Sequence, residues 1–308
     1  MIQFALDRSP LSMSTDSKQC HTGALHQQAP LPFEAAQHYE TTVLDWATAD
    51  LPGDIAVVRN CAYGPDIQHR YDVFRRIHFN NAPILVFWHG GGWTNGYKEY
   101  VAFMADAVTR LGMVLVAPTY RLAPEHKLPA AFDDAIAALG RIRKHASSFG
   151  GAADRLYLAG HSAGGHLAAL VALRRLAVEQ AGIPPGTIQA CLPISAIMDL
   201  HHPKPEKDSM EERVYTMVLG NAAEDALMSP LSWTAGNTVP MYLSYGEFDS
   251  ERVIRGNQRI AALLAEQPAD FRVEMEHGLD HFSTHTTLIH PDQAWYQQLA
   301  ELISRSST

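Results

Sequence analysis

The sequence predicts an α/β fold in which a mostly parallel sheet is covered by helices on both faces. Two observations support this prediction. Short, continuous apolar runs alternate along the chain with longer segments of helical periodicity, and apolar runs of this length are typical of strands buried on both faces. The helical segments also supply the crossovers that parallel neighbours require. In such a sheet, the ligand site is expected at the carboxyl ends of the strands.

Six apolar runs are predicted to form strands, at residues 84–88, 113–117, 156–159, 191–194, 241–244 and 271–275. Helical patterns lie before, between and after these runs, at residues 39–47, 100–110, 129–145, 163–178, 252–265 and 291–304. Pro129 and Pro291 begin two of the predicted helices. Proline suits that position because the first helical N–H has no partner within the helix. We expect the helix at residues 39–47 to pack near the mouth of the site.

Two segments depart from this alternation. Residues 1–30 are rich in Ser, Thr and Gln and lack periodicity, so we expect a flexible or loosely packed N-terminal segment. Residues 201–233 follow one predicted strand and precede another. We interpret them as an insertion that forms a small cap together with the N-terminal segment. Residues 31–308 are therefore predicted to form a single domain that includes this small cap.

Composition excludes several classes of function. The chain has 24 Lys and Arg against 33 Asp and Glu, a net charge of −9, so neither nucleic acid nor an anionic membrane is an expected partner. The start lacks a signal-peptide pattern, and no apolar run reaches the ~20 residues that span a bilayer. The three cysteines, Cys20, Cys61 and Cys191, form no CxxC motif, which argues against a disulfide framework or a cysteine zinc site.

From these features we expect a cytoplasmic protein that acts on a small molecule without a metal or other cofactor. The adjacent His201 and His202 lie in a polar loop, where neighbouring side chains point apart, and they are not predicted to bind metal. The sequence leaves open whether two copies pair as a homodimer.

The strongest chemical signal is a G-x-S-x-G motif at residues 160–164. It directly follows a predicted strand and directly precedes a predicted helix, which is the context of a nucleophile elbow. Small flanking residues allow a turn tight enough to present the Ser162 hydroxyl above the sheet. The positive end of the following helix faces the same point. A chance match in a glycine-rich loop is the alternative, and the flanking strand and helix argue against it.

A second motif, His-Gly-Gly-Gly-Trp at residues 89–93, follows another predicted strand. Acyl transfer builds negative charge on a carbonyl oxygen, and backbone N–H groups held in place stabilise that charge. Glycines let the backbone approach closely because they have no Cβ atom. We assign the oxyanion hole to the amides of Gly91, Gly92 and Ala163. The alternative is a flexible glycine-rich loop.

A serine hydroxyl is a weak nucleophile, so a base and an orienting acid are also needed. In this arrangement the acid and then the histidine follow the serine along the chain. Asp249, after the strand at 241–244, is the predicted acid, with Glu247 as the alternative. His281, in the loop after the last strand, is the predicted base. The chain has 16 histidines, so the residue type alone identifies none of them. His281 is favoured by its place in this loop, and His277 and His285 are the alternatives.

Together these residues resemble the α/β-hydrolase superfamily, and within it the hormone-sensitive-lipase-like esterases and the kynurenine formamidases (arylformamidases). The two motifs at residues 89–93 and 160–164 match the paired signature of these enzymes, and the resemblance covers about residues 56–304. It implies a serine hydrolase that cleaves carboxylic esters, aryl amides or formamides of small acyl groups. The formamidases often carry an aromatic residue in the third glycine position, where this chain has Gly92.

Three residues beside the motifs are predicted to contact the substrate: Trp93, His161 and Phe282. Trp46 and Trp233 are further candidates for an aromatic rim, and ordinary packing is the alternative for each. Two other functions are weighed against hydrolysis. A non-catalytic binding protein on this fold would have lost one of the three catalytic residues, and all are present here. An acyltransferase differs only in its acceptor, which fold alone does not reveal.

Overall fold

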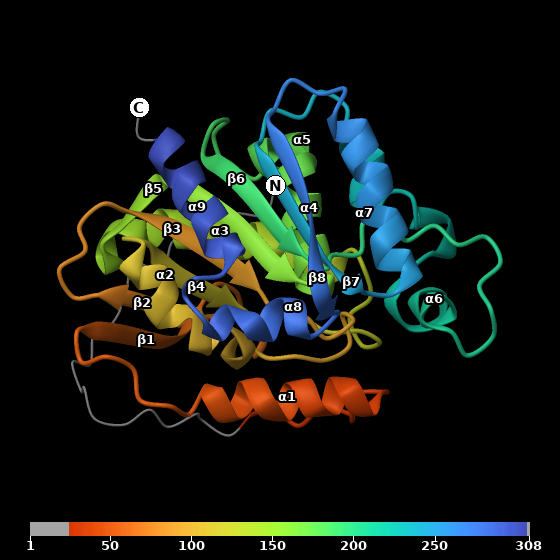
Figure 1. Ribbon diagram of the computed structural model, residues 1–308, viewed down its shortest axis with the longest axis horizontal. Helices are drawn as coiled ribbons and strands as arrows, with labels where there is room; N and C mark the ends of the chain where they lie inside the picture. The colour runs from red at the N-terminus through yellow and green to blue at the C-terminus, as the bar shows by residue number, and fades with distance from the viewer. Residues whose placement is uncertain (1–24, 307–308) are drawn as a thin grey trace.

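The computed structural model describes residues 25–306, and in this part of the chain it contains one sheet of eight strands (Figure 1). Their order is β1-β2-β4-β3-β5-β6-β7-β8. The strands are β1 (Ile55–Ala62), β2 (Arg70–Arg76), β3 (Ala82–Trp88), β4 (Val114–Pro118), β5 (Gly151–His161), β6 (Ile188–Ile194), β7 (Met241–Phe248) and β8 (Phe271–Asp280). β2 runs opposite to the other seven strands, and all pairs that do not include β2 are parallel. The predicted mostly parallel sheet is therefore confirmed.

Helices cover both faces of the sheet. They are α1 (Glu34–Trp46), α2 (Ala105–Arg110), α3 (Ala130–His145), α4 (Ala163–Leu173), α5 (Arg175–Gln180), α6 (Met210–Arg213), α7 (Glu251–Leu264), α8 (Ser283–Thr286) and α9 (Ala294–Arg305). Alternate residues of a strand point to opposite faces. Val86 of β3 accordingly packs in one apolar cluster with α3, α4 and α7, whereas Phe87 packs in a second cluster with α2 and α9. In Figure 1, α9 crosses in front of the sheet.

All six predicted strands are present, and β1 and β2 add two more at one edge. β1 escaped prediction because it is an edge strand with mostly half-buried residues, and polar Arg59 and Asn60 interrupt its apolar run. An edge strand needs no continuous apolar sequence, because part of its surface meets water.

Several predicted helices differ from the structure. The helix expected at 291–304 begins only at Ala294, so Pro291 lies before α9 and does not begin it. The helix expected at 100–110 begins as a 3-10 helix, η1 (Lys98–Met104), before α2. The helix expected at 163–178 is divided at Arg174, which leaves the helical conformation (φ −84°, ψ 57°). The Arg174 guanidinium lies over the rings of Phe132 and Trp233, 4.5 and 4.6 Å from their centroids. These tertiary contacts stabilise the break, and the local sequence pattern does not reveal them.

The order of the strands reverses at β3, which is hydrogen-bonded to β4 on one side and to β5 on the other. In open α/β sheets, such a reversal opens a crevice at the carboxyl ends of the strands. The residues that follow β3 and β5 are the two glycine-rich motifs of the sequence. The topology therefore brings the two motifs together.

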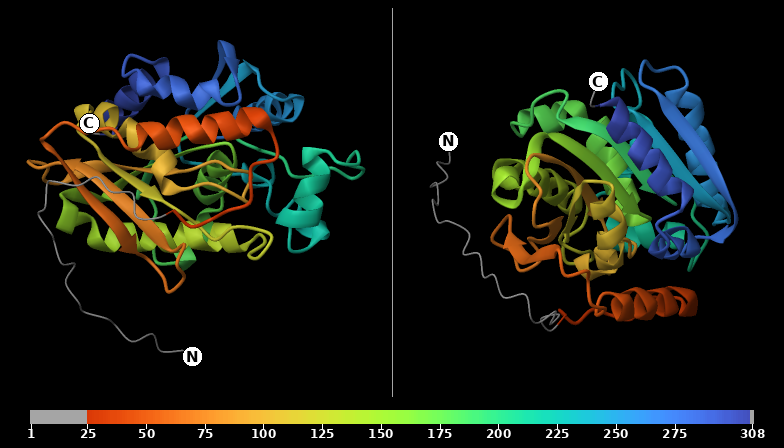
Figure 2. Two further views of the ribbon diagram at one scale, coloured as in Figure 1. Left: turned by 90° about the horizontal axis from the view of Figure 1, so that it is seen from below. Right: turned by 60° about the vertical axis from the view of Figure 1, so that its left-hand side comes forward.

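The predicted insertion at residues 201–233 lies between β6 and β7 and contains α6, which continues into a π-helical turn, η3 (Val214–Val218). Leu128, just before α3, donates its N–H to the carbonyl of Val218 (2.8 Å) and accepts from the N–H of Gly220 (3.1 Å). These bonds fix the insertion to the main body. Figure 2 shows α1 lying along the outside of the body, and its buried side chains Tyr39 and Val43 pack in one apolar cluster with Tyr100 of η1.

Most of the segment predicted to be loose, residues 1–24, lies outside the described residues. The described end of that segment, residues 25–30, is held by hydrogen bonds. The Gln28 side chain bonds both the N–H and the carbonyl of Gly96 (2.7 and 2.9 Å), and the Asn95 amide donates to the carbonyl of Ala29 (2.5 Å). This stretch therefore lies against the loop that carries the second glycine motif. None of the helices between residues 25 and 306 has the length and apolar character that a membrane span needs.

Candidate active site

Ser162 stands in the tight turn between β5 and α4. Its backbone is left-handed (φ 56°, ψ −118°), a conformation that is uncommon for a residue with a side chain and is often found at functional sites. Only glycine fits at positions 160 and 164, because a side-chain atom there would overlap neighbouring backbone. A Cβ atom on Gly160 would lie 2.4 Å from the backbone of Gly164, and one on Gly164 would lie 2.0 Å from the carbonyl oxygen of Trp88. The two glycines thus leave room for the tight turn that carries Ser162.

The predicted serine, histidine and acid lie together. His281 Nδ1 is 2.6 Å from Asp249 Oδ1, and His281 Nε2 is 2.9 Å from Ser162 Oγ. Because a carboxylate oxygen only accepts, Nδ1 carries the proton and donates to Asp249. In the neutral ring Nε2 is then an acceptor, and the Ser162 hydroxyl donates to it. The three side chains form one directed line of hydrogen bonds.

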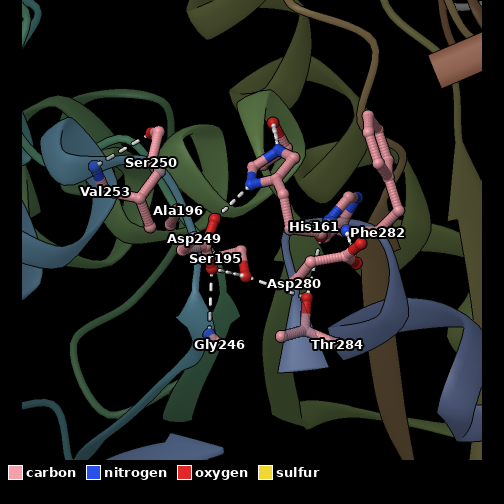
Figure 3. A network of polar contacts seen from close by, with 12 residues as sticks. His161, Ser195, Ala196, Gly246, Asp249, Ser250, Val253, Asp280, Phe282 and Thr284 are labelled. Atoms are coloured by element: carbon pink, nitrogen blue, oxygen red, sulfur yellow. Dashed lines mark hydrogen bonds and ion pairs between the residues drawn. The ribbon is translucent and has the colours of Figure 1, made fainter. Parts of the chain in front are cut away.

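Asp249 is buried, and its other oxygen is also satisfied. Asp249 Oδ2 accepts from the hydroxyl of Ser195 (2.6 Å) and from the N–H of Gly246 (2.9 Å) (Figure 3). Burial alone raises the pKa of Asp249, but the hydrogen bond and the charge of His281, with the bonds from Ser195 and Gly246, lower it below its usual value. The acid therefore stays an anion. Ser195, at the end of β6, was not predicted, because only the sheet topology brings it to this loop.

The alternatives to the predicted acid and base occupy other places. Glu247 is exposed, and its carboxylate accepts from the N–H of Gly278 (2.9 Å) and lies 3.4 Å from His277 Nδ1. His285 is fully buried and is hydrogen-bonded to the hydroxyl of Tyr39 (2.8 Å). None of the three contacts Ser162. Geometry therefore favours Asp249 and His281 over their neighbours in sequence.

The amides assigned to the oxyanion hole lie at the two motifs. Gly91 and Gly92 line the same cavity as Ser162, and both have positive φ values (120° and 61°). Between residues 25 and 306, no acceptor bonds to either N–H. Ala163 is the first residue of α4, and the N–H groups of a first helical turn have no partner within the helix. All three amides are thus available to a ligand oxygen.

His161, the residue before the serine, is fully buried. Its Nε2 lies 2.7 Å from the backbone carbonyl of His281. A carbonyl only accepts, so Nε2 carries the proton. Burial lowers the pKa of His161 to about 3, with the neighbouring His281 adding to the effect, and the ring is neutral at physiological pH. It therefore acts as a fixed N–H donor to the main chain of the candidate base.

A cavity of about 370 Å³ opens onto Ser162 and His281. Its wall comes from α1, the glycine motif, the insertion and the start of α7, and its apolar lining residues include Leu31, Phe33, Tyr39, Trp93, Ile197, Val214, Val218, Val253 and Phe282. The predicted contact residues Trp93, His161 and Phe282 all line it. The Trp93 indole N–H is already bound to His166 Nδ1 (3.2 Å), so only the ring surface of Trp93 is offered to a ligand.

The two further aromatic candidates lie elsewhere. Trp46 packs edge-on against Phe103, with ring centroids 5.2 Å apart, and Trp233 stacks on Arg174. Neither lines the cavity, so the packing alternative holds for both. Sequence reasoning also missed Tyr39, Arg213 and Arg252, which do line it. Arg252 follows Asp249 by less than one helical turn, and that proximity to the predicted acid was the available signal.

The described residues contain no group of three or more His, Cys, Asp or Glu side chains arranged to hold a metal ion. His201 Nδ1 is instead paired with Asp225 Oδ2 at 2.7 Å. Cys61 and Cys191 are free and buried, while Cys20 lies outside the described residues.

Comparison with known proteins identifies the fold family of the chain. The sequence profile of the alpha/beta hydrolase fold family matches residues 85–284, which include Ser162, Asp249 and His281. This chain belongs to that family. The α/β-hydrolase fold expected from the sequence is therefore confirmed.

Among curated proteins, the chain is similar to Carboxylesterase NlhH of Mycobacterium tuberculosis, with 31% identity over 188 residues. The match covers 56% of this chain and 58% of NlhH. It is also similar to Carboxylic ester hydrolase LipN of the same organism, with 45% identity over 95 residues, or 29% of this chain and 24% of LipN. The chain thus matches little more than half the length of one relative and a quarter of the other.

Solved structures show the same fold. An esterase of Pyrobaculum calidifontis superposes with a TM-score of 0.72 at 22% identity, covering 89% of this chain and 93% of that one. The carboxylesterase EstE1, cloned from a metagenomic library, gives a TM-score of 0.69 at 21% identity, with 89% and 95% covered. At this level of identity the likeness extends to the fold and no further.

Proposed function

We propose that this α/β hydrolase is a serine carboxylesterase that works through a covalent acyl-enzyme. The observation that carries the proposal is the line of hydrogen bonds from Asp249 through His281 to Ser162, with distances of 2.6 and 2.9 Å. A hydroxyl, an imidazole and a carboxylate in this order form the arrangement that activates serine for acyl transfer. The relatives NlhH and LipN, by their names, act on carboxylic esters, which supports the same reaction class.

In the first half of the reaction, Ser162 Oγ attacks the carbonyl carbon of the ester while His281 Nε2 takes the hydroxyl proton. The carbonyl oxygen becomes an oxyanion, and the N–H groups of Gly91, Gly92 and Ala163 stabilise it. One such donor typically contributes about 10²–10³ in rate. Asp249 holds the imidazole in the required tautomer and stabilises the imidazolium without taking its proton.

The imidazolium then donates its proton to the leaving alcohol oxygen as the ester bond breaks, which leaves the acyl group on Ser162. Water enters the place of the alcohol. His281 takes a proton from it, the resulting hydroxide equivalent attacks the acyl carbonyl, and a second oxyanion forms at the same amides. Its collapse returns the proton to Ser162 and releases the carboxylic acid.

We propose small-molecule substrates whose apolar portion lies against the cavity wall. The rings of Tyr39, Trp93 and Phe282 line that wall, which favours aryl groups and makes an aryl formamide or amide the second candidate substrate. The chemistry of the steps is the same, with an amine as the leaving group.

The test uses a fluorophosphonate probe together with 4-nitrophenyl butyrate and an aryl formamide. We expect the probe to label wild type on Ser162 and not to label Ser162→Ala. We also expect Ser162→Ala to lower kcat for the ester by about 10³-fold or more, with an unchanged circular dichroism spectrum. No labelling and no turnover by folded wild type would favour the non-catalytic binding protein.

The acyltransferase alternative is separated by product analysis. With 4-nitrophenyl butyrate and a millimolar alcohol, a hydrolase releases mainly butyric acid, because water is the abundant acceptor. A product mixture dominated by the new butyrate ester would replace the esterase proposal by acyl transfer.

A further inference from the structure

Two arginines line the candidate active-site cavity, and neither takes part in the steps above. Arg252 lies in the first turn of α7, just after the candidate acid, and Arg213 ends α6 in the insertion. Most of the surrounding wall is apolar. A cation withdrawn from water into such a place destabilises the fold unless it is paired. The partners of both arginines therefore indicate what the cavity is built to hold.

Arg252 is poorly paired for a buried guanidinium. Its side chain is only 9% exposed, and no acceptor in the described residues bonds to its Nε. Its Nη2 donates to the carbonyl of Asp199 over a long 3.4 Å. Its Nη1 lies 3.9 Å from Glu211 Oε1, which is outside hydrogen-bond distance. A guanidinium offers five N–H donors, so most of the donors of Arg252 have no acceptor at good distance.

The local charge balance is positive. Arg213 donates to the hydroxyl of Thr94 at 3.3 Å, beside the glycine motif, and this bond leaves its charge uncancelled. Among the cavity-lining residues in the described part of the chain, Glu211 is the one acid, against Arg213 and Arg252. Burial lowers the pKa of Arg252, and Glu211 and Asp199 offset only part of this effect. The cavity thus combines apolar walls with an incompletely neutralised pair of guanidinium groups.

We propose that Arg252, assisted by Arg213, binds a carboxylate that the substrate carries in addition to its scissile bond. The preferred substrates are then esters or amides with an apolar body and an anionic end. A guanidinium matches a carboxylate through two parallel charge-assisted hydrogen bonds, and these would give Nη1 and Nη2 acceptors at shorter distances than Glu211 and Asp199 offer. This inference rests on the proposed esterase function and names its substrate class.

The test compares matched substrates that differ only in this charge. For the acyl side, the pair is the 4-nitrophenyl monoester of adipic acid and the 4-nitrophenyl ester of adipic acid monoamide. For the alcohol side, the pair is 3-carboxyphenyl butyrate and 3-carbamoylphenyl butyrate. We expect kcat/KM of wild type to be at least about 10-fold higher for the carboxylate member of one pair, and the responding pair identifies which side of the substrate meets Arg252.

In Arg252→Gln, we expect the ratio of kcat/KM between carboxylate and carboxamide substrates to fall by about 10- to 100-fold, the loss typical of a hydrogen-bonded charged group. Arg213→Gln should lower the ratio less, and Arg252→Lys should keep part of it. The matched control is Arg255→Gln on the same helix, because Arg255 is 70% exposed and pairs with Glu251. We expect this control to keep the wild-type ratio.

Equal kcat/KM for both members of both pairs in wild type would overturn the inference while leaving the esterase function intact. An unchanged ratio in Arg252→Gln would overturn it equally. If Arg252→Gln does not fold, Arg252→Lys and Arg213→Gln decide, and wild-type ratios in both would reject the arginine assignment. Absence of turnover and of fluorophosphonate labelling in wild type would instead reject the proposed function itself.

Discussion

His161 Nε2 donates a hydrogen bond to the backbone carbonyl of His281 over 2.7 Å, so the residue before the candidate nucleophile fixes the main chain of the candidate base. The Thr284 hydroxyl donates to the same carbonyl at 2.9 Å. Both sides of the Ser162–His281 hydrogen bond are thus held by one local network. Because His161 is buried and neutral, this N–H donor is present throughout the physiological pH range.

The first prediction follows from this bond. His161→Phe keeps a ring of similar shape and removes the donor, so the imidazole of His281 loses one of its restraints. We expect kcat for 4-nitrophenyl butyrate to fall about 10-fold with KM within about 3-fold of wild type, because small misplacements of a catalytic group slow the chemistry. Steady-state kinetics measure both constants.

His161→Gln is the matched variant, because its side-chain amide offers an N–H donor without the ring. It should recover part of the lost kcat. A raised KM with unchanged kcat in His161→Phe would instead mean that His161 acts by contacting the substrate, the role predicted from the sequence.

The second prediction separates His281, which directly follows β8, from His277, which lies within β8. His281→Ala removes the group bonded to both Ser162 and Asp249, so we expect kcat/KM to fall by about 10³-fold or more. His277 is 79% exposed and faces Glu247, so His277→Ala should keep kcat/KM within about 2-fold of wild type. Similar losses in both variants, measured with the same ester, would contradict the assignment of the base.

The sequence was most informative where a residue type is forced by local geometry. Gly160 and Gly164 are required by contacts that lie within one turn of chain or on the adjacent strand, and the strand-turn-helix context is readable from local patterns. Asp249 and His281 were chosen from the sequence because each follows a strand whose carboxyl end must reach the same edge of the sheet.

The cavity was less predictable, because its wall depends on contacts between distant segments. Tyr39 reaches it from α1, and Arg213 reaches it from the insertion, and no periodicity states how those segments dock. Trp46 and Trp93 are both aromatic residues near predicted elements, yet only Trp93 lines the cavity. The helix break at Arg174 was unpredictable for the same reason, because it is stabilised by rings from two other segments of the chain.

The third prediction tests the packing of the nucleophile turn. A Cβ atom on Gly164 would lie 2.0 Å from the carbonyl oxygen of Trp88, whereas one on Gly140, in the middle of α3, would meet nothing within 4 Å. We expect Gly164→Ala to lower the free energy of unfolding by about 1–3 kcal/mol, because β3 must shift. Gly140→Ala should raise it by up to about 1 kcal/mol through helix propensity. Urea unfolding measures both, and equal stabilities of the two variants would contradict the close contact.

The fourth prediction concerns Glu276, a half-buried residue of β8 that pairs with Gly246 in the sheet. Burial, with the negative charges of Glu274 and Asp249, raises the pKa of Glu276 from 4.5 to about 7. Between these two values the folded state holds a proton that the unfolded state has released. The free energy of unfolding therefore decreases as pH rises from about 4.5 to about 7.

Glu276→Gln removes this contribution, because its amide stays neutral at every pH. We expect the variant to gain stability relative to wild type on going from pH 5 to pH 8, measured as the difference in free energy of unfolding from urea titrations at each pH. Other titrating groups contribute to both proteins and cancel in the difference. Glu301→Gln, an exposed position on α9, is the control and should keep the wild-type pH dependence. The same dependence in Glu276→Gln would show that the carboxyl of Glu276 is ionised in the folded state throughout this range, against the effect of its burial.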